Sequence, residues 1–405
     1  MLNANWNINA GASFSGSWDK INLGELRNDS VLDYRSIGIN SSNTLSQGRV
    51  VFTRYTGVLS AFRIGAEYQY GWEQSKFTSF GINPFSTYQF ADNFTSTFAE
   101  MEYYFNAKIV MKPGVRAEYS SILGKENVAP RLSVAYRLGK NSQLSFAYGD
   151  FYEKPDRRYL FYTHDLNFEK ATHLVLNYQR IHNDKTFRVE AFYKDYQSLI
   201  LTPLSSLSLV QNPSNVYSNN FDPTNISNGG HGYAKGVELF LRDKKTIKNC
   251  DYWISYSYLD TKRIYSYYPT EVQPDFAANH TLNVVFKQFF PKLMLGYGVT
   301  YSWASGRPYY NPNQPSDKFM SDRTPDYNVV GMNANYLTHI GKAFTVLVLG
   351  VSNVLGQNQI YGYRYSTNGA NREPIGLTAS RFVFVGCFMN WGVDRRQQQV
   401  DDNLK

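Results

Sequence analysis

The 405-residue chain has no run of about 18 apolar residues, the length that marks a transmembrane helix, and its mean hydropathy is −0.43. No transmembrane helix is therefore expected. Cysteine is also scarce: Cys250 and Cys387 are the only two, and because several predicted hairpins separate them, we expect no disulfide. The six histidines occur singly, without the spacing that a zinc site needs, so we expect neither a metal nor a cofactor.

The sequence does contain a regular alternation of apolar and polar residues, in segments of about ten residues. In one such segment Phe187 and Val189 fall on one face of a strand, whereas Arg188 and Glu190 fall on the other. Charges on the second face indicate contact with water or polar protein rather than with a packed core. The pattern predicts an all-β, antiparallel transmembrane β-barrel with lipid outside and a polar lumen. The charged residues that we predict to face the lumen are Arg131, Arg137, Arg188, Glu190, Glu238 and Arg242.

Aromatic residues are abundant, since 33 Tyr, 27 Phe and 6 Trp make up 16% of the chain. A Tyr ring tolerates apolar surroundings while its hydroxyl stays hydrated, and aromatic girdles at the two membrane interfaces use this property. The alternative, an aromatic-rich soluble β-protein, would need an inner face without charges.

The net charge of +8 and the pI of about 9.1 also suit a nucleic-acid-binding protein. However, no basic cluster with interleaved aromatic residues marks a nucleic-acid-binding module. Several Lys and Arg fall instead in connections, as in 242–248, or at predicted lumen-facing positions. We therefore expect no nucleic-acid partner.

Connections of two lengths alternate between the predicted strands. The seven short ones include 182–184 and 340–342, and the eight longer ones include 202–230 and 306–324. In outer-membrane barrels the short turns face the periplasm and the long loops face outward, so we expect the long connections outside. The sixteen predicted strands span residues 4–18, 47–57, 59–75, 92–106, 107–120, 127–138, 142–152, 169–181, 185–201, 231–243, 251–261, 277–289, 292–305, 325–338, 342–355 and 377–392.

The last predicted strand ends the barrel with an alternating apolar series that finishes at an aromatic residue. The polar residues after it predict a periplasmic tail. We therefore divide the chain into a transmembrane barrel over 1–392 and a tail over 393–405. The alternating series consists of Val383, Val385, Cys387, Met389 and Trp391.

The predicted outer loops are rich in Pro, Asn, Ser and Tyr, which is typical of solvated surface loops. Tyr and Asn can also stack on a polar ligand and form hydrogen bonds with it. The residues of these loops that we predict to contact a ligand are Tyr267, Tyr268, Arg307, Tyr309 and Tyr310.

Several segments resemble the barrel of the TonB-dependent receptors, in the form common in Bacteroidota. Residues 130–133 and 148–155 resemble a strand pair followed by an aromatic Gln-x-Pro loop, with Lys154 in place of the expected Gln. Residues 234–238 resemble the family's Gly-x-Glu strand entry. Each motif is weak alone, but together they follow the family order over 130–392. The other matching segments are 169–173, 193–200, 279–283, 305–308, 351–355 and 381–386.

The resemblance implies a barrel of twenty-two strands in the bacterial outer membrane, with a plug domain inside it. With about sixteen strands and no secretion signal after Met1, the chain resembles the C-terminal portion of such a receptor, without the plug. The implied function is uptake of a scarce, bulky nutrient, namely a siderophore-iron complex, cobalamin, an oligosaccharide or a peptide, energised through TonB. The implied partners are outer-membrane lipid and lipopolysaccharide, the plug domain, TonB, the nutrient and a surface lipoprotein.

Two other classes of function stay open. A self-contained, sixteen-stranded, porin-like channel for passive diffusion would use the same strands. An outer-membrane hydrolase would need a nucleophile, a base and an orienting residue together at one barrel rim. Asp, Ser and His are present, but nothing in the sequence places them together, and we expect no enzyme.

Overall fold

The computed structural model of the protein describes residues 5–23, 26–28, 31–32, 37–57, 60–79, 86–202, 225–366 and 369–391. Its main feature is one sheet of sixteen strands, in sequence order and antiparallel throughout. The strands are β1 (Trp6–Leu23), β4 (Ile37–Tyr55), β5 (Ala61–Ser79), β6 (Ser86–Tyr104), β7 (Ile109–Ser120), β8 (Lys125–Arg137), β9 (Ser142–Glu153), β10 (Glu169–His182), β11 (Lys185–Leu201), β12 (Ser227–Asp243), β13 (Cys250–Ile264), β14 (His280–Phe290), β15 (Leu295–Ala304), β18 (Tyr327–Ile340), β19 (Ala343–Ser352) and β22 (Phe382–Asn390).

Smaller elements lie in the connections. Three two-stranded sheets and three short helices occur among the described residues, and none of these helices is long and apolar enough to cross a membrane. They are β2 (Leu26–Asn28) with β3 (Val31–Leu32), β16 (Pro308–Tyr309) with β17 (Asp322–Arg323), β20 (Ile360–Tyr365) with β21 (Arg372–Gly376), the helix α1 (Arg157–Leu160), and the 3-10 helices η2 (Pro291–Leu293) and η3 (Ser316–Lys318).

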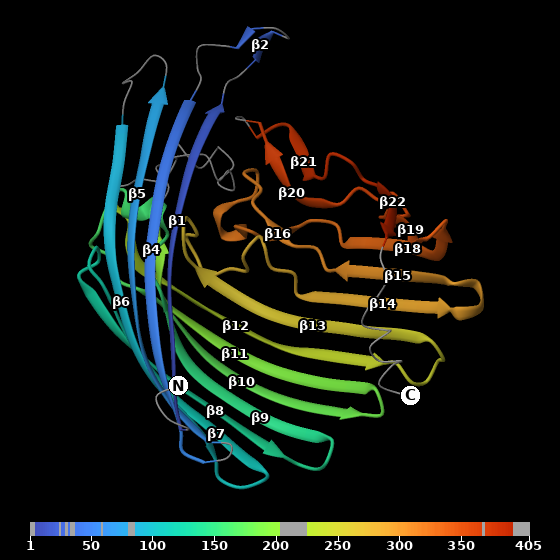
Figure 1. Cartoon of the computed structure of the whole chain (residues 1–405). Coiled ribbons are helices and arrows are strands. Elements are labelled where there is room, and N and C mark those ends of the chain that lie inside the picture. The colour runs from blue at the N-terminus through green and yellow to red at the C-terminus, as the bar shows by residue number, and fades with distance from the viewer. Residues whose placement is uncertain are drawn as a thin grey trace.

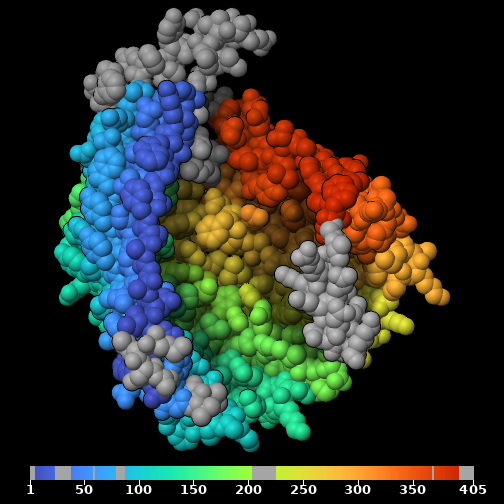
Figure 2. All heavy atoms as spheres, viewed as in Figure 1, coloured from blue at the N-terminus to red at the C-terminus, as the bar shows by residue number. Residues whose placement is uncertain are grey.

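The large sheet curves around a hollow, with β1 at one end of the strand order and β22 at the other (Figure 1). The hollow is open between the N-terminal and the C-terminal strands in the space-filling view (Figure 2). β1 and β22 do not pair with each other, so the described sheet is not closed. The predicted all-β architecture with sixteen antiparallel strands is confirmed. The predicted tail, 393–405, lies outside the described residues.

Each predicted strand corresponds to one observed strand. β4 and β6 are longer than predicted, β12 and β13 are four residues longer each, and β22 is shorter than the predicted strand 377–392. β4 begins at Ile37 rather than at residue 47, and β6 begins at Ser86 rather than at residue 92. The extensions are rich in Ser, Asn and Gln, which pair across strands: the Ser41 and Ser75 hydroxyls lie 2.9 Å apart. A strand that continues beyond the apolar band needs no apolar face, so the alternation gave no signal there.

The predicted alternation of short and long connections is wrong at two places. The connection between β5 and β6 spans only residues 80–85, no longer than the turn 244–249 at the opposite rim. The connection between β7 and β8, predicted to be a long one, is the four-residue turn 121–124, and Gly124 takes a φ of +60° in it. It is as short as the turn 138–141 at the other rim. Elsewhere the short turns lie along one rim of the sheet and the longer connections along the opposite rim, which we call the turn rim and the loop rim (Figure 1).

The two faces of the sheet differ in chemistry. On β12 the side chains of Val237, Leu239 and Leu241 are exposed, by 40%, 38% and 46%, on what we call the apolar face. Ion pairs bracket this band: Lys235 with Asp260 at the loop rim (3.4 Å), and Asp243 with Lys185 at the turn rim (3.0 Å). Positions 235 and 243 are about 26 Å apart along the strand. A tilt of about 40° reduces this to roughly 20 Å in height, close to the apolar band of an outer-membrane barrel.

A small apolar core lies at the loop rim, where α1 and its loop pack against β6. Among its buried side chains are Tyr159 and Leu160, and Phe90 and Phe94 of β6 pack against the cluster. Asp156 caps α1 by accepting a hydrogen bond from the Arg158 backbone N–H (2.9 Å). The core therefore fixes the connection 154–168 onto the sheet.

Lys154 anchors this connection. It directly precedes Pro155 and so occupies the middle position of the Gln-x-Pro motif, in which Glu153 stands at the Gln position. Its ammonium group forms an ion pair with Asp92 of β6, whose side chain is almost fully buried. The same carboxylate accepts hydrogen bonds from the Ser120 hydroxyl (2.9 Å) and the Ile122 backbone N–H (3.1 Å). Lys154 therefore has a partner of opposite charge in this chain.

Candidate functional site

The strand register places all six residues predicted to face the lumen on one face of the sheet, opposite the apolar face. Arg131 lies across from Gly149, and the register continues through β10 to Glu190 and from there to Glu238. Partners in an antiparallel register point to the same side. The six residues therefore share one face, which we call the polar face; that this face lines a lumen stays a prediction.

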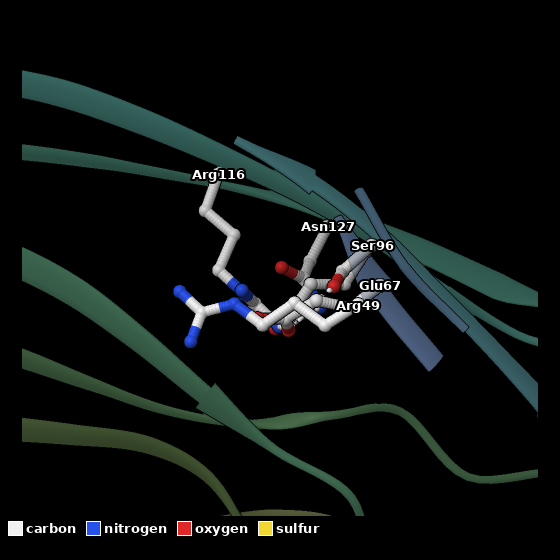
Figure 3. Close-up of polar contacts among 6 residues, drawn as sticks. Arg49, Glu67, Ser96, Arg116 and Asn127 are labelled. Carbon is white, nitrogen blue, oxygen red and sulfur yellow. Dashed lines mark hydrogen bonds and ion pairs between the residues drawn. The ribbon is translucent and has the colours of Figure 1, made fainter. Parts of the chain in front are cut away.

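A network of charged and polar side chains ties β4, β5, β6, β7 and β8 together on the polar face (Figure 3), with the Ser96 hydroxyl of β6 donating to Glu67 at 3.2 Å. Glu67 of β5 binds two arginines, Arg49 of β4 at 3.0 Å and Arg116 of β7 at 2.7 Å. Arg116 also binds Glu118 (2.6 Å), which accepts a hydrogen bond from the Asn127 amide of β8 (3.2 Å). Two cations and two anions balance, so the network joins strands and adds no net charge to the wall.

The six predicted residues have different partners. Arg242 forms a bidentate ion pair with Asp251 of β13, with Nε 2.8 Å from Oδ1 and a terminal guanidinium nitrogen 2.6 Å from Oδ2. Arg131 lies over the ring of Phe151 at 4.7 Å, and Arg188 over the ring of Phe240 at 5.7 Å. Arg137 lies at the end of β8 beside the turn rim and is exposed.

Two glutamates stand directly opposite each other on this face. Glu190 of β11 is the register partner of Glu238 of β12. Glu190 accepts one hydrogen bond, from the Asn177 amide at 3.0 Å, and no cation pairs with either carboxylate among the described residues. Like charges opposite each other destabilise a strand pair, so this position calls for a donor from outside the sheet.

Part of the predicted ligand site gathers around Phe319 in the loop that follows β15. The rings of Tyr267, Tyr268 and Tyr310 have their centroids 6.4, 5.4 and 5.7 Å from the Phe319 centroid. Tyr268 is buried, and its hydroxyl accepts a hydrogen bond from the Asp275 backbone N–H (3.2 Å). Burial raises the pKa of Tyr268 well above its ordinary value. Tyr267 and Tyr310 are half-buried and keep accessible surface.

The other two predicted residues lie in neighbouring aromatic contacts. Tyr309 is buried against Tyr363 (4.7 Å) and accepts a hydrogen bond from Arg372 (2.9 Å). Burial and the neighbouring Tyr365 raise the pKa of Tyr309 to about 12. Arg307 lies over the ring of Tyr361 at 5.7 Å and is half-buried.

These positions divide the five predicted ligand residues into two kinds. Tyr268 and Tyr309 lie inside the loops and hold them together. Tyr267, Tyr310 and Arg307 present surface that a ligand can reach. Ligand contact by any of the five stays a prediction.

Glycines at two family motifs are required by close contact. A Cβ on Gly236 would come within 2.1 Å of the Tyr258 carbonyl oxygen, and one on Gly306 within 2.0 Å of the Thr324 carbonyl oxygen. Both contacts are with backbone, so no side-chain movement would relieve them. The motifs 234–238 and 305–308 are therefore explained by packing in the sheet and at the loop rim.

An aromatic belt closes the apolar face at the loop rim. His280 stacks on Trp303 (6.3 Å) and accepts or donates a hydrogen bond with the Tyr256 hydroxyl (2.8 Å). The indole N–H of Trp303 donates to Asp326 (3.0 Å). Rings on the apolar face with their polar atoms directed to hydrophilic partners are typical of a membrane interface.

The comparison with known families matches this architecture. Residues 2–354 match the family described as "TonB dependent receptor-like, beta-barrel". The chain belongs to this family of β-barrels of the bacterial outer membrane. Its family and fold are those of receptors and transporters rather than of enzymes. No curated protein sequence matches the chain.

Solved structures with similar folds include three metal-related transporters. The ferric citrate transporter FecA in its unliganded form has a TM-score of 0.70 at 14% identity, with 96% of this chain and 60% of that chain covered. The ferric yersiniabactin uptake receptor FyuA from Yersinia pestis has a TM-score of 0.71 at 12% identity, with 96% of this chain and 60% of that chain covered. The copper transporter OprC has a TM-score of 0.69 at 12% identity, with 95% of this chain and 62% of that chain covered. At these identities the likeness shows the fold alone, and this chain spans about 60% of the length of the first two structures.

Proposed function

We propose that the chain forms most of the barrel of a receptor that imports a metal chelate across the outer membrane, energised through TonB. Three similar structures are those of a ferric citrate transporter, a ferric yersiniabactin uptake receptor and a copper transporter, which favours a metal chelate over cobalamin, an oligosaccharide or a peptide. The polar face is then the lumen, the loop rim faces outward and the turn rim faces the periplasm. A plug domain, lipopolysaccharide, a surface lipoprotein and the Bacteroidota form of the receptor belong to the same proposal.

The observation that favours a filled lumen over a porin lies at β22. Phe382, Phe384 and Phe388 share the face of Gly350 and Val346 of β19, which is the polar face, and are exposed by 65%, 43% and 57%. A water-filled channel would leave three Phe side chains hydrated, at a cost of about 1.5–3 kcal/mol each relative to burial. A protein domain packed inside the barrel would cover them. The unpaired Glu190 and Glu238 suit the same occupant, which can supply the missing donor.

Uptake measurements test the proposal. We expect cells that carry the complete receptor to accumulate radiolabelled iron or copper from at least one chelate, and to lose this uptake when TonB is deleted. Accumulation that persists without TonB would contradict energised transport.

Single-channel recording separates the receptor from the porin. The complete receptor is expected to be nearly non-conducting in planar bilayers, because its lumen is filled. Residues 1–405 alone are expected to fail to close or to give large, poorly selective leaks. Stable, uniform, ion-selective channels from residues 1–405 would instead establish the porin.

A further inference from the structure

Two groups of cations on the polar face differ in their partners. In the first group each cation pairs with a carboxylate, as Arg116 does with Glu67. In the second group no carboxylate partner occurs among the described residues, and each cation lies over an aromatic ring instead. The second group is Arg131 over Phe151, Arg188 over Phe240, Lys194 over Phe192, Arg263 over Tyr196 and Lys287 over Trp253.

Arg263 is the member nearest the loop rim, at the end of β13. Its register partner on β12 is Gly232, where a Cβ would come within 2.7 Å of the Arg263 Cγ. The absent side chain lets Arg263 cross β12 and place its guanidinium 4.1 Å from the ring centroid of Tyr196 on β11. Phe276, at 5.5 Å, and Tyr265, at 6.0 Å, flank the same guanidinium.

This arrangement leaves the guanidinium without a hydrogen-bond acceptor. Nε of Arg263 is buried and has no partner, and no ion pair or side-chain hydrogen bond of Arg263 occurs in the described part of the chain. Glu169 accepts the Ile200 N–H at 2.9 Å, and Asp260 pairs with Lys235 on the other face. Glu271 and Asp275 lie beside the segment that faces Arg263, but neither forms an ion pair with it among the described residues. Three rings therefore hold a charged, planar donor in place without neutralising it.

Lys194 adds a second free cation beside the first. It lies two residues from Tyr196 on the same strand, hence on the same face, with Nζ 5.5 Å from the Phe192 ring centroid. Its side chain has no carboxylate partner in the described residues. Its register partner on β10 is His173, not an acid. The loop end of β11 therefore presents positive charge between aromatic surfaces.

We propose that Arg263 and Lys194 form an anion site at the loop-rim mouth of the lumen, which binds a carboxylate group of the transported ligand. The inference rests on the proposed function and narrows its substrate class to anionic chelates. A guanidinium matches a carboxylate with two parallel hydrogen bonds, and its rings keep it oriented before the ligand arrives. Aromatic walls also reduce the access of water, which strengthens each bond.

Ferric citrate is the probe for the test, with metal-free citrate beside it, and binding is measured by equilibrium dialysis on the complete receptor purified from outer membranes. Arg263→Gln should weaken ferric citrate binding about tenfold or more, because it removes the positive charge and the two parallel N–H donors of the guanidinium. Arg263→Lys should lose less, and Lys194→Gln should also weaken binding. The matched control is Lys235→Gln, at the same end of β12 but on the apolar face, and it should leave binding unchanged. Heat-dependent gel mobility of the barrel verifies that each variant is folded.

The outcomes are separate from those of the uptake experiment. Failure of the unaltered receptor to bind either probe overturns the anion site, as does equal binding by Arg263→Gln. Uptake of neutral or cationic chelates alone also overturns it, while TonB-dependent metal uptake still supports the proposed function. If the receptor takes up no chelate but still binds citrate in a way that depends on Arg263, the proposed function is overturned and the anion site stands.

Discussion

Substitution of Leu239 by Arg tests the assignment of the two faces. Leu239 is the middle residue of the exposed band on β12, four residues from Lys235 and four from Asp243. Each distance is about 13 Å along the strand, so position 239 lies near the centre of the apolar band. Arg at the midplane of an outer-membrane barrel costs about 2–4 kcal/mol on the lipid face, and we expect a loss of stability in this range.

The neighbouring Phe240 is the matched control. It points to the polar face, where Arg188 lies over its ring. Phe240→Arg would therefore place a second cation beside Arg188, with Glu238 two residues away on the same face. A like-charge neighbour in a sheet costs about 0.2–1 kcal/mol, so the loss should be clearly smaller than at position 239.

The measurement is the free energy of unfolding of the complete receptor in liposomes, from reversible titration with urea. Leu239→Ala separates the loss of side-chain packing from the burial of charge. Equal losses for Leu239→Arg and Phe240→Arg would refute the face assignment, and a larger loss at Phe240 would reverse it.

The remaining predictions concern the loop rim. Burial raises the pKa of Asp275 above its ordinary value of 3.8, so the folded loop favours the protonated side chain. The loop 265–279 should therefore lose hydrogen-exchange protection as the pH rises above that value, and Asp275→Asn should abolish this dependence. Lys154→Ala leaves the buried Asp92 without a cation and should lower the stability of the receptor by about 1–3 kcal/mol in thermal unfolding. Lys154→Gln still donates a hydrogen bond and should lose less stability. Equal losses for the two variants would show that the ion pair is unimportant. A tag at Pro312 in intact cells should react with an impermeant reagent and one at Lys245 should not, and the reverse pattern would overturn the topology.

Period-two patterning located strands well wherever the two faces differ. β11 has the predicted bounds, Lys185–Leu201, because its faces alternate and because Asn183 and Asp184, with φ values of 48° and 57°, form a tight two-residue turn before it. The first ten residues of β4 carry mostly Ser, Asn and Thr on both faces, so apolar and polar residues do not alternate there. Their strand structure comes from pairing with β5, which the sequence does not display.

The site was less predictable than the sheet, because it depends on register and on loop packing. Alternation placed Arg131 and Glu238 on a common face, but it could not show that Arg116 meets Glu67, forty-nine residues earlier in the chain. Arg63, Glu67 and Glu73 share one face of β5, and this pattern is a signal for charged partners on the neighbouring strands. The aromatic contact of Tyr267 with Phe319 joins two connections, and composition alone does not indicate which rings meet.

The unpaired edges set a physical condition on any membrane state of this sheet. β1 has 18 residues and pairs on one side only, so about nine residues direct a backbone N–H and C=O away from the sheet. Each such group costs several kcal/mol in hydrocarbon, where no water can satisfy it. β22 presents a second edge with the same requirement. Within lipid, therefore, both edges must pair, either with further strands or with each other after the hollow narrows, and the free energy of that pairing is large compared with any single substitution considered above.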